Sequence, residues 1–130
     1  MSRVNFQQPI DNAASIVESY AAGKRDFSKA ELGNANLAGV NLRGADLSYA
    51  DLSQANLRGA NLRGCDLSFA DLSQANLCDA DLRGAMLFST DMRQADLQGT
   101  QLNQADSDRT THFPINFDIK QAGIQIREVI

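Results

Sequence analysis

Large apolar residues recur at every fifth position through most of the chain. All fourteen leucines, from Leu32 to Leu102, obey this spacing, and the two gaps in the series hold Phe27 and Met92. A small residue, usually alanine, stands two places before each of them except Phe27, where Arg25 takes that place. The repeating unit is therefore A-(D/N)-L-x-x, and it runs sixteen times over residues 25–104. We number the places in this unit from one to five, so that leucine occupies the third position.

This five-residue period fits neither an α-helix nor a flat strand. Leucines at every fifth place of a helix would advance by about 140° per unit and wrap around its whole surface, whereas a strand alternates with a period of two. The pattern is explained if each unit forms one side of a square, so that alanine and leucine point inward and four units close one coil. The longer period that this requires is present, because residues 45–64 and 65–84 are identical at 15 of 20 positions.

The sixteen units resemble the pentapeptide repeat family, and the resemblance covers residues 25–106. It implies an all-β fold, a right-handed quadrilateral β-helix of about four coils with leucines stacked inside. The segment IVESYAAGKRDF at residues 16–27 also resembles the short helix that commonly precedes the first coil in this family. We therefore expect an N-terminal segment with a short capping α-helix (1–24), the β-helix (25–107) and a C-terminal cap or tail (108–130).

Both ends of a stacked coil expose apolar side chains and unpaired backbone groups, so we expect each end to be covered. Residues 11–22 read as an amphipathic helix that covers the first coil. Its apolar face carries Ala13, Ile16, Val17 and Tyr20. At the other end, residues 108–130 are too apolar for a free tail. We expect a helical turn near 117–122 and a strand near 124–129 to cover the last coil, unless this surface pairs with another chain.

The interior and the corners of the square make different demands on the sequence. Two walls meet at the first position, so a large side chain would overpack it. We expect the structural core to contain Leu47, Leu52, Leu57, Leu62, Leu67, Leu72, Leu77 and Leu82. Glycine takes the fifth position on only two of the four sides. The other two sides carry residues such as Tyr49 and Gln54 there, and we therefore expect two kinds of corner turn.

Composition limits the function classes. A chain of 130 residues is one domain, and a net charge of −4 argues against general binding of nucleic acid through phosphate contacts. No run approaches the ~18 apolar residues of a membrane span, and the first residues lack the apolar core of a signal peptide. We expect a soluble, cytoplasmic protein with no direct contact to nucleic acid or membrane.

Stacked coils align outward side chains in columns that can be read from the sequence. We number the sides by their central leucines, so that Leu47 lies on side 1, Leu52 on side 2, Leu57 on side 3 and Leu62 on side 4. The candidate partner surface comprises an aromatic strip on side 1 (Tyr49, Phe69, Phe88), an acidic column on side 2 (Asp51, Asp71, Asp91) and an arginine column on side 4 (Arg43, Arg63, Arg83). A plainer interpretation is that Asp and Asn bond to corner amides, that Arg pairs with nearby Asp, and that the rings stack on each other.

Residues with catalytic or metal-binding potential are sparse. His112 is the single histidine, and neither a phosphate-binding loop nor a nucleophile elbow occurs. Cys65 takes an alanine position inside the square, whereas Cys78 points outward on a different side, so we expect no disulfide and an exposed Cys78 thiol. We expect no enzyme activity, no metal and no cofactor.

Two functions remain. The first is a non-catalytic structural or protein-interaction module with an unknown protein partner. The resemblance implies the second, a DNA-mimicking binder of DNA gyrase or topoisomerase, because family members that bind gyrase present an acidic rod, usually as a dimer. Four coils, a modest net charge and the arginine column depart from that pattern. A homodimer through the C-terminal end is open under both functions.

Overall fold

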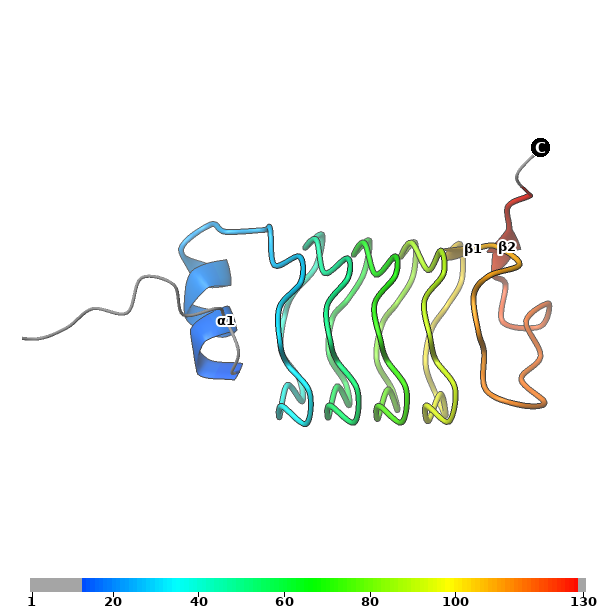
Figure 1. Cartoon of the computed structure of the whole chain (residues 1–130), viewed down its shortest axis with the longest axis horizontal. Helices are drawn as coiled ribbons and strands as arrows, with labels where there is room; N and C mark the ends of the chain where they lie inside the picture. The colour runs from blue at the N-terminus through cyan, green and yellow to red at the C-terminus, as the bar shows by residue number, and fades with distance from the viewer. Residues whose placement is uncertain (1–12, 129–130) are drawn as a thin grey trace, which may run out of the picture.

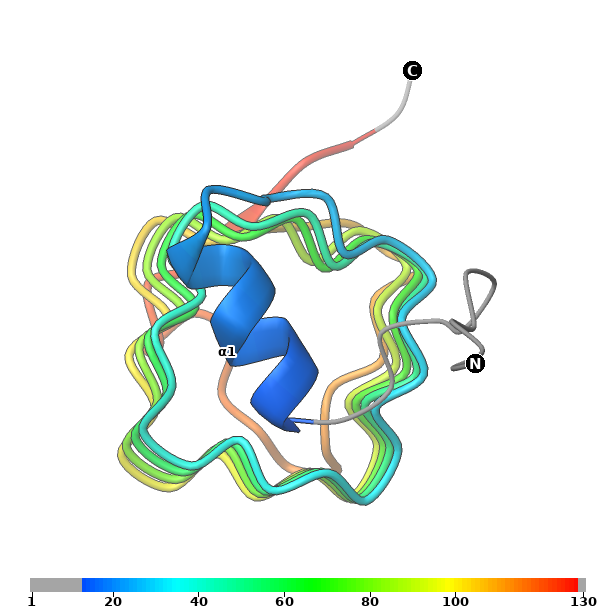
Figure 2. The ribbon, with the colours of Figure 1, turned by 90° about the vertical axis from the view of Figure 1, so that its left-hand side faces the viewer.

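The computed structural model describes residues 13–128 as a stack of coils preceded by one helix (Figure 1). Helix α1 spans Ala13–Ala21. Strands β1 (Asp106–Ser107) and β2 (Gln125–Ile126) pair in parallel at the opposite end. Viewed along the stack, the coils superpose on one four-cornered outline (Figure 2). A square cross-section is expected when the chain turns between successive five-residue units and four units close one coil.

Backbone hydrogen bonds join each unit to the equivalent unit of the next coil. Parallel bridges connect Asp26 with Asp46 and Asp46 with Asp66, and equivalent bridges occur on all four sides. In each unit of residues 25–84 the N–H of the central apolar residue and the corner N–H both donate to the following coil; the Leu47 N–H, for example, donates to the Asp66 carbonyl over 2.8 Å. The bridges are separated by corners, which is why the repeat contains isolated bridges rather than long strands.

All corners of the repeat turn in the same way, so the expectation of two corner types is wrong. The fifth residue of every unit has a φ between +55° and +76°, whether it is glycine or not. Each turn is closed by a bond such as that from the Ala50 N–H to the Leu47 carbonyl, 3.1 Å long. A positive φ at the third residue of such a turn defines type II. The coil-to-coil bonds impose this geometry, and Tyr49 adopts it (+61°) although glycine does so at lower cost.

Leucine and alanine fill the interior. Every leucine is buried except Leu97, which is partly exposed in the last regular coil, and all eight leucines expected in the core are fully buried. The threonines at the first position, Thr90 and Thr100, are also accommodated, since each donates to the carbonyl of a leucine in the preceding coil. The Thr90 hydroxyl donates to the Leu67 carbonyl over 2.7 Å.

Helix α1 lies across the opening of the first coil (Figure 2). Ile16 is fully buried, and the Tyr20 hydroxyl donates to the Arg43 carbonyl over 2.6 Å. Val17 is 46% exposed, so its expected place on the buried face is wrong. A helix that crosses the opening contacts the coil through a narrow stripe, which Ile16 occupies and Val17 does not. The first two residues of the expected helix, 11 and 12, lie outside the described residues.

Beyond the repeat, the chain makes one further, irregular turn around the axis. Asp91 bridges to His112, one place later than the regular register, whereas Asp106 in β1 pairs with Gln125 in β2, one place earlier. The side chains that pack on the last regular coil are Phe113, Phe117, Ile119, Ala122 and Ile124. Ser107, which takes the place of the next leucine, is also buried.

Two local expectations for this final segment can be compared with the structure. The helical turn expected near 117–122 corresponds to a single turn in which the Ala122 N–H donates to the Asp118 carbonyl over 3.2 Å. The strand expected near 124–129 is shorter, because within residues 124–128 strand β2 spans Gln125–Ile126 alone. Expectations that involve Ile130 lie outside the described residues.

We predict that Ala55→Leu destabilises the middle coils. Ala55 is completely buried beside the leucine stack, and added methyl groups in a packed interior typically cost about 1–3 kcal/mol. Chemical denaturation would measure this loss as a lower free energy of unfolding. Ala38→Leu is the matched control, because Ala38 is exposed. Equal stability of the Ala55→Leu and Ala38→Leu proteins would contradict the square cross-section.

Candidate interaction surface

The Asp and Asn side chains at the second position are bonded to backbone N–H groups of the corner turns. Oδ1 of Asp51 accepts hydrogen bonds from the Ser53 N–H (3.0 Å) and the Ser53 hydroxyl (2.6 Å). Oδ1 of Asn61 likewise accepts from the Arg63 N–H over 3.1 Å. Such Asx turns hold the side chain in one orientation. They confirm the plainer interpretation of these columns as far as the corner bonds are concerned.

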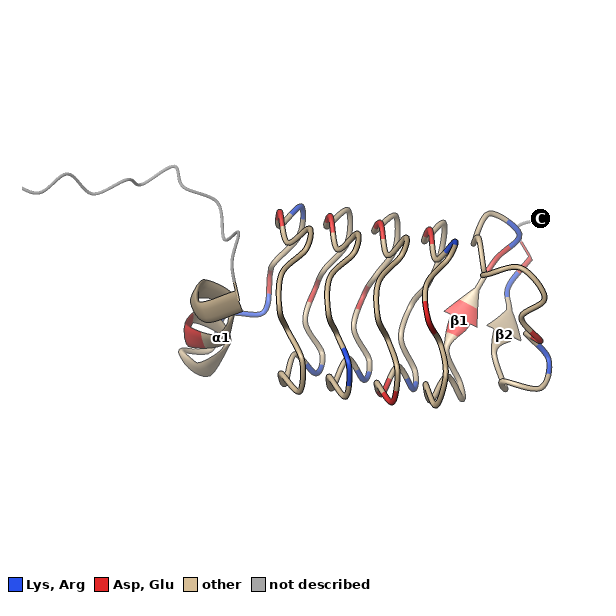
Figure 3. Ribbon diagram, turned by 90° about the horizontal axis from the view of Figure 1, so that it is seen from below, with Lys and Arg blue, Asp and Glu red and all other residues tan. Residues whose placement is uncertain are grey.

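Acidic positions recur from coil to coil along the stack (Figure 3). The column of Asp51, Asp71 and Asp91 lies on side 2 as expected, but it is not uniformly negative. Arg93 binds Asp91 through two contacts, Nε to Oδ1 (2.9 Å) and Nη2 to Oδ2 (2.7 Å). The side-chain hydrogen bond from Arg93 is the main reason that the pKa of Asp91 lies below its usual range.

The arginine column on side 4 divides into paired and unpaired members. Arg83 binds Asp81 as Arg93 binds Asp91, with contacts of 2.9 and 2.7 Å, and this hydrogen bonding lowers the pKa of Asp81. Within residues 13–128, Arg43 and Arg63 form no ion pair. The expected pairing of arginine with nearby aspartate therefore holds for Arg83 but not for the rest of the column.

The aromatic strip on side 1 is a stacked pair and a separate ring. Tyr49 and Phe69 stack with their ring centroids 4.8 Å apart and their planes within 3°. Both remain largely exposed, at 57% and 53%. Phe88 is half-buried and, in the described part of the chain, makes no ring contact with this pair. The structure therefore brings two of the three expected residues together.

One exposed apolar residue near this strip was missed by the sequence analysis. Met86 occupies the second position of a unit on side 1, is 36% exposed and bridges to Asp66 in the preceding coil. The sequence does distinguish Met86, because the other second positions on side 1 hold aspartate: Asp26, Asp46, Asp66 and Asp106.

A ladder of glutamines runs along the corner of side 2. The Gln54 amide donates to Oε1 of Gln74 over 2.9 Å, and the Gln74 amide donates to Oε1 of Gln94 over 3.0 Å. Neighbouring coils thus fix each other's outward side chains, just as the Asx turns fix the aspartates.

The two cysteines are both free and both shielded. Burial raises the pKa of the Cys65 thiol to about 12. Cys78 is only 8% exposed, so the expectation of an exposed thiol is wrong. Asp96 lies beside Cys78, and its hydrogen bond with the thiol is the main cause of the raised pKa of Cys78. An outward direction does not guarantee exposure where a side chain of a neighbouring coil, here Asp96, lies beside the residue.

No group of three or more His, Cys, Asp or Glu side chains within residues 13–128 is arranged to hold a metal ion. No helix in the same range is long and apolar enough to cross a membrane.

A family profile described as pentapeptide repeats matches residues 26–64 and 65–106. The chain belongs to the pentapeptide repeat family. A solved pentapeptide repeat protein from Nostoc PCC 7120, alr5209, is 66% identical with a TM-score of 0.91, and the match covers 93% of this chain and 100% of that one. This likeness implies the right-handed β-helix expected from the repeat.

Other solved relatives are more distant. HetL from Nostoc sp. strain PCC 7120, a pentapeptide repeat protein involved in heterocyst differentiation regulation, is 38% identical with a TM-score of 0.40 and covers 75% of this chain and 48% of its own. A pentapeptide repeat protein from the Arabidopsis thaliana thylakoid lumen is 38% identical with a TM-score of 0.48 and covers 64% of this chain and 55% of its own. A comparison with curated protein sequences gave no match.

We predict that Asp81 and Asp91 contribute to acid unfolding. Because their pKa values are lowered in the fold, their stabilisation is complete above the unfolded-state pKa of about 3.9 and is lost as the pH falls through the folded-state values. Asp81→Asn with Asp91→Asn keeps the turn acceptor but removes the titration. Urea unfolding should show a smaller loss of stability between about pH 5 and pH 2.

The expected loss of stability in the double variant is small because the two ion pairs are exposed to solvent. Both pairs are partly solvated, so the double variant should lose at most about 1 kcal/mol at pH 7. Asp46→Asn is the control, because Asp46 forms no ion pair among the described residues. An unchanged acid slope in the double variant would show that the two arginine pairs are irrelevant to acid stability.

Proposed function

We propose that the protein is a rigid, non-catalytic protein-interaction module. In this proposal four regular coils form a right-handed quadrilateral β-helix, closed by α1 at one end and by residues 108–128 at the other. The flat sides of this body recognise a protein partner in the cytoplasm, without direct contact to nucleic acid or membrane. Membership of the pentapeptide repeat family supports the architectural part of the proposal.

The observation that carries the proposal is the ordering of outward polar side chains before any partner binds. Asp51 and its equivalents are held by Asx turns, and Gln54, Gln74 and Gln94 are held by their own ladder. Immobilising a flexible side chain at an interface costs about 0.5–1.5 kcal/mol. Side chains that are already fixed avoid much of this cost, so such a surface is suited to specific binding.

The distribution of titratable side chains also supports a non-catalytic role. Catalytic groups usually converge on a concave site. Here the interior is occupied by leucine and alanine, and the carboxylates and guanidinium groups are spread along the outer sides.

We predict that one side of the square carries the partner contact. Four single variants each alter an exposed residue on a different side: Phe69→Lys, Gln74→Lys, Arg58→Glu and Arg63→Glu. Proximity labelling in the source cells should enrich a protein with the wild type, and one variant should lose at least about tenfold of that enrichment. The other three variants serve as controls. If no protein is enriched, or if all four variants retain it, the module function is overturned.

The alternative is a DNA-mimicking binder of DNA gyrase or topoisomerase, and the acidic columns on sides 1 and 2 are the feature that favours it. Arg93 interrupts the column on side 2 by pairing with Asp91. We therefore expect an excess of the protein to leave gyrase supercoiling unchanged. Inhibition that Asp51→Asn with Asp71→Asn removes would replace the interaction-module proposal with the DNA-mimic function.

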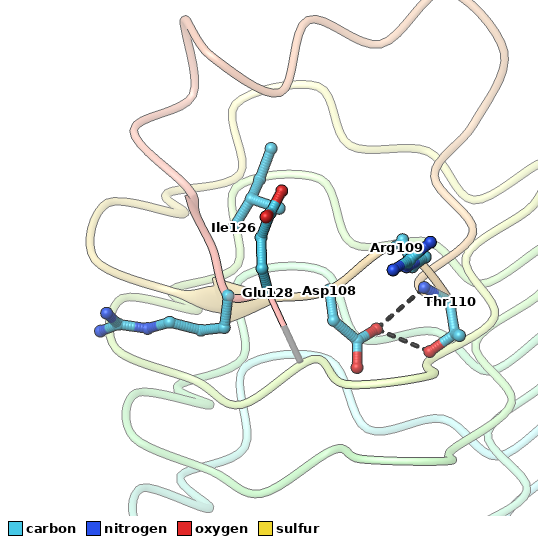
Figure 4. Close-up of a pocket in the computed structure, with 6 residues that line it drawn as sticks. Asp108, Arg109, Thr110, Ile126 and Glu128 are labelled. Atoms are coloured by element: carbon cyan, nitrogen blue, oxygen red, sulfur yellow. Dashed lines mark hydrogen bonds between the residues drawn. The ribbon is translucent and has the colours of Figure 1, made fainter. Parts of the chain in front are cut away.

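A homodimer through the C-terminal end is part of the proposal. Ile126 in β2 is 54% exposed, and a cavity of about 210 Å³ lies beside it, lined by Asp108, Arg109, Thr110, Ile126, Arg127 and Glu128 (Figure 4). Oδ1 of Asp108 accepts hydrogen bonds from the Thr110 N–H (3.0 Å) and hydroxyl (2.6 Å), which orders one wall of this cavity.

We predict that Ile126→Glu separates this dimer into monomers. The substitution places a charge in the exposed apolar part of the end surface, where it would have to be desolvated on association. Light scattering should give a dimer mass for the wild type and a monomer mass for the variant. Val17→Glu is the control, because Val17 is exposed at the opposite end. A monomeric wild type would contradict the dimer.

A further inference from the structure

The polar pattern of side 1 is broken in one unit. Along this side the second position holds aspartate and the fourth position holds serine, as in Asp46 with Ser48 and Asp66 with Ser68. In the next coil these places hold Met86 and Phe88. Both substitutions replace a small polar residue by a large apolar one on the outer surface, within a single unit.

The break removes stabilising bonds from the corner. Oδ1 of Asp46 accepts from the Ser48 N–H over 2.9 Å, and Oδ1 of Asp66 accepts from the Ser68 N–H over the same distance. Met86 has no oxygen in its side chain, so the Phe88 N–H lacks this partner. Met86 is also 36% exposed, so part of its apolar side chain faces solvent. A local rule broken at partly exposed positions, with the turn bond lost, indicates a functional constraint.

Met86 and Phe88 adjoin the exposed aromatic pair. The Phe69 N–H donates to the Phe88 carbonyl over 2.9 Å, and Met86 bridges to Asp66. Tyr49 stacks on Phe69 from the preceding coil. Tyr49, Phe69, Met86 and Phe88 thus lie in adjacent units of side 1 across three coils, with the first two rings stacked and Phe88 apart from them, and we call these four residues the side 1 patch. Clustered exposed apolar side chains of this kind mark interaction surfaces.

The charges around the patch select its partner. Asp46 and Asp66 lie on the same side, and Oδ2 of each accepts no hydrogen bond from the described residues. Asp106, in the turn that follows Met86, bridges to Met86 and forms an ion pair with Arg127 over 2.8 Å. Tyr49 and Phe69 occupy the fifth position on side 1. Within residues 25–104, one cation occupies this position on side 1, namely Lys29 in the coil that precedes Tyr49. The rim is therefore mainly acidic, which favours cationic groups next to an apolar anchor.

We propose that the side 1 patch docks a protein segment that presents one large apolar side chain flanked by lysine or arginine. The apolar side chain packs against Phe69, Met86 and Phe88, and the flanking cations face Asp46 and Asp66. This inference rests on the proposed interaction-module function and assigns the module's partner surface to side 1.

The decisive variant is Met86→Asp with Phe88→Ser. It recreates the Asp66–Ser68 turn in the next coil, so the melting temperature should be unchanged or higher while the patch is removed. The probe is a synthetic peptide with a central Phe flanked by lysines, titrated into isotope-labelled protein and followed by NMR. We expect shifts at the patch amides with the wild type and at least about tenfold weaker binding with the variant.

Matched peptides and a matched variant test the chemistry. A peptide with Glu in place of Lys and one with Ala in place of Phe should each bind at least about tenfold more weakly. Gln101→Asn introduces the same kind of Asx turn on side 4 and should leave binding unchanged. Tyr49→Gln with Phe69→Gln is a second patch variant that also weakens binding, since glutamine already occupies corners at positions 54 and 74.

Several results would overturn the assignment. These are no shifts at about 1 mM peptide, equal binding by the Glu-flanked peptide, or full binding by both patch variants. Self-association that Met86→Asp with Phe88→Ser abolishes would make a second copy the occupant instead. If the peptides fail and Gln74→Lys, Arg58→Glu or Arg63→Glu, rather than Phe69→Lys, loses the cellular partner, the module function stands and only the side 1 assignment falls.

Discussion

The coil-to-coil hydrogen bond from a leucine N–H to the carbonyl of the following coil sets the geometry on which the other features depend. It places each leucine directly under its counterpart, so that Leu47 and Leu67 stack inside the square, bonded as Leu47 N–H to Asp66 carbonyl over 2.8 Å. Adjacent coils of a parallel ladder lie about 4.8 Å apart. At that separation the first position admits alanine, or a group such as the Thr90 hydroxyl that has its own acceptor. Stability then accumulates along one axis from contacts between neighbouring coils.

The sequence was sufficient to predict which residues point inward, because the leucine period states it directly. It was insufficient for the corners, where Tyr49 and Gly59 share one turn type, with φ of +61° and +68°. Glycine frequency reports the cost of a conformation, whereas the hydrogen bonds of neighbouring coils decide which conformation is adopted. For the same reason Cys78 was misjudged, since its shielding depends on side chains of other coils, including Asp96.

The register of the final turn and the pairing of the surface side chains could not be predicted from the repeat. The register lengthens by one place at His112 and shortens by one place at Gln125, and these shifts depend on how Phe113 and Ile124 pack, which no period encodes. On the outer sides, the columns of Asp51, Arg43 and Tyr49 were placed correctly by counting. Their pairing was not, because Arg83 has an aspartate within reach on its own turn and Arg43 does not.

A repeat supplies its own reference state, and this allows departures from it to be interpreted individually. Arg93 replaces the serine of its column, but it gains two contacts with Asp91. Thr90 replaces alanine and gains the Leu67 carbonyl. Each of these changes is compensated inside the chain. Met86 and Phe88 lose a turn bond and leave part of an apolar surface exposed, and neither side chain gains a hydrogen bond in return. Because folding explains the first two departures and leaves the third unexplained, the third is the one that points to a partner.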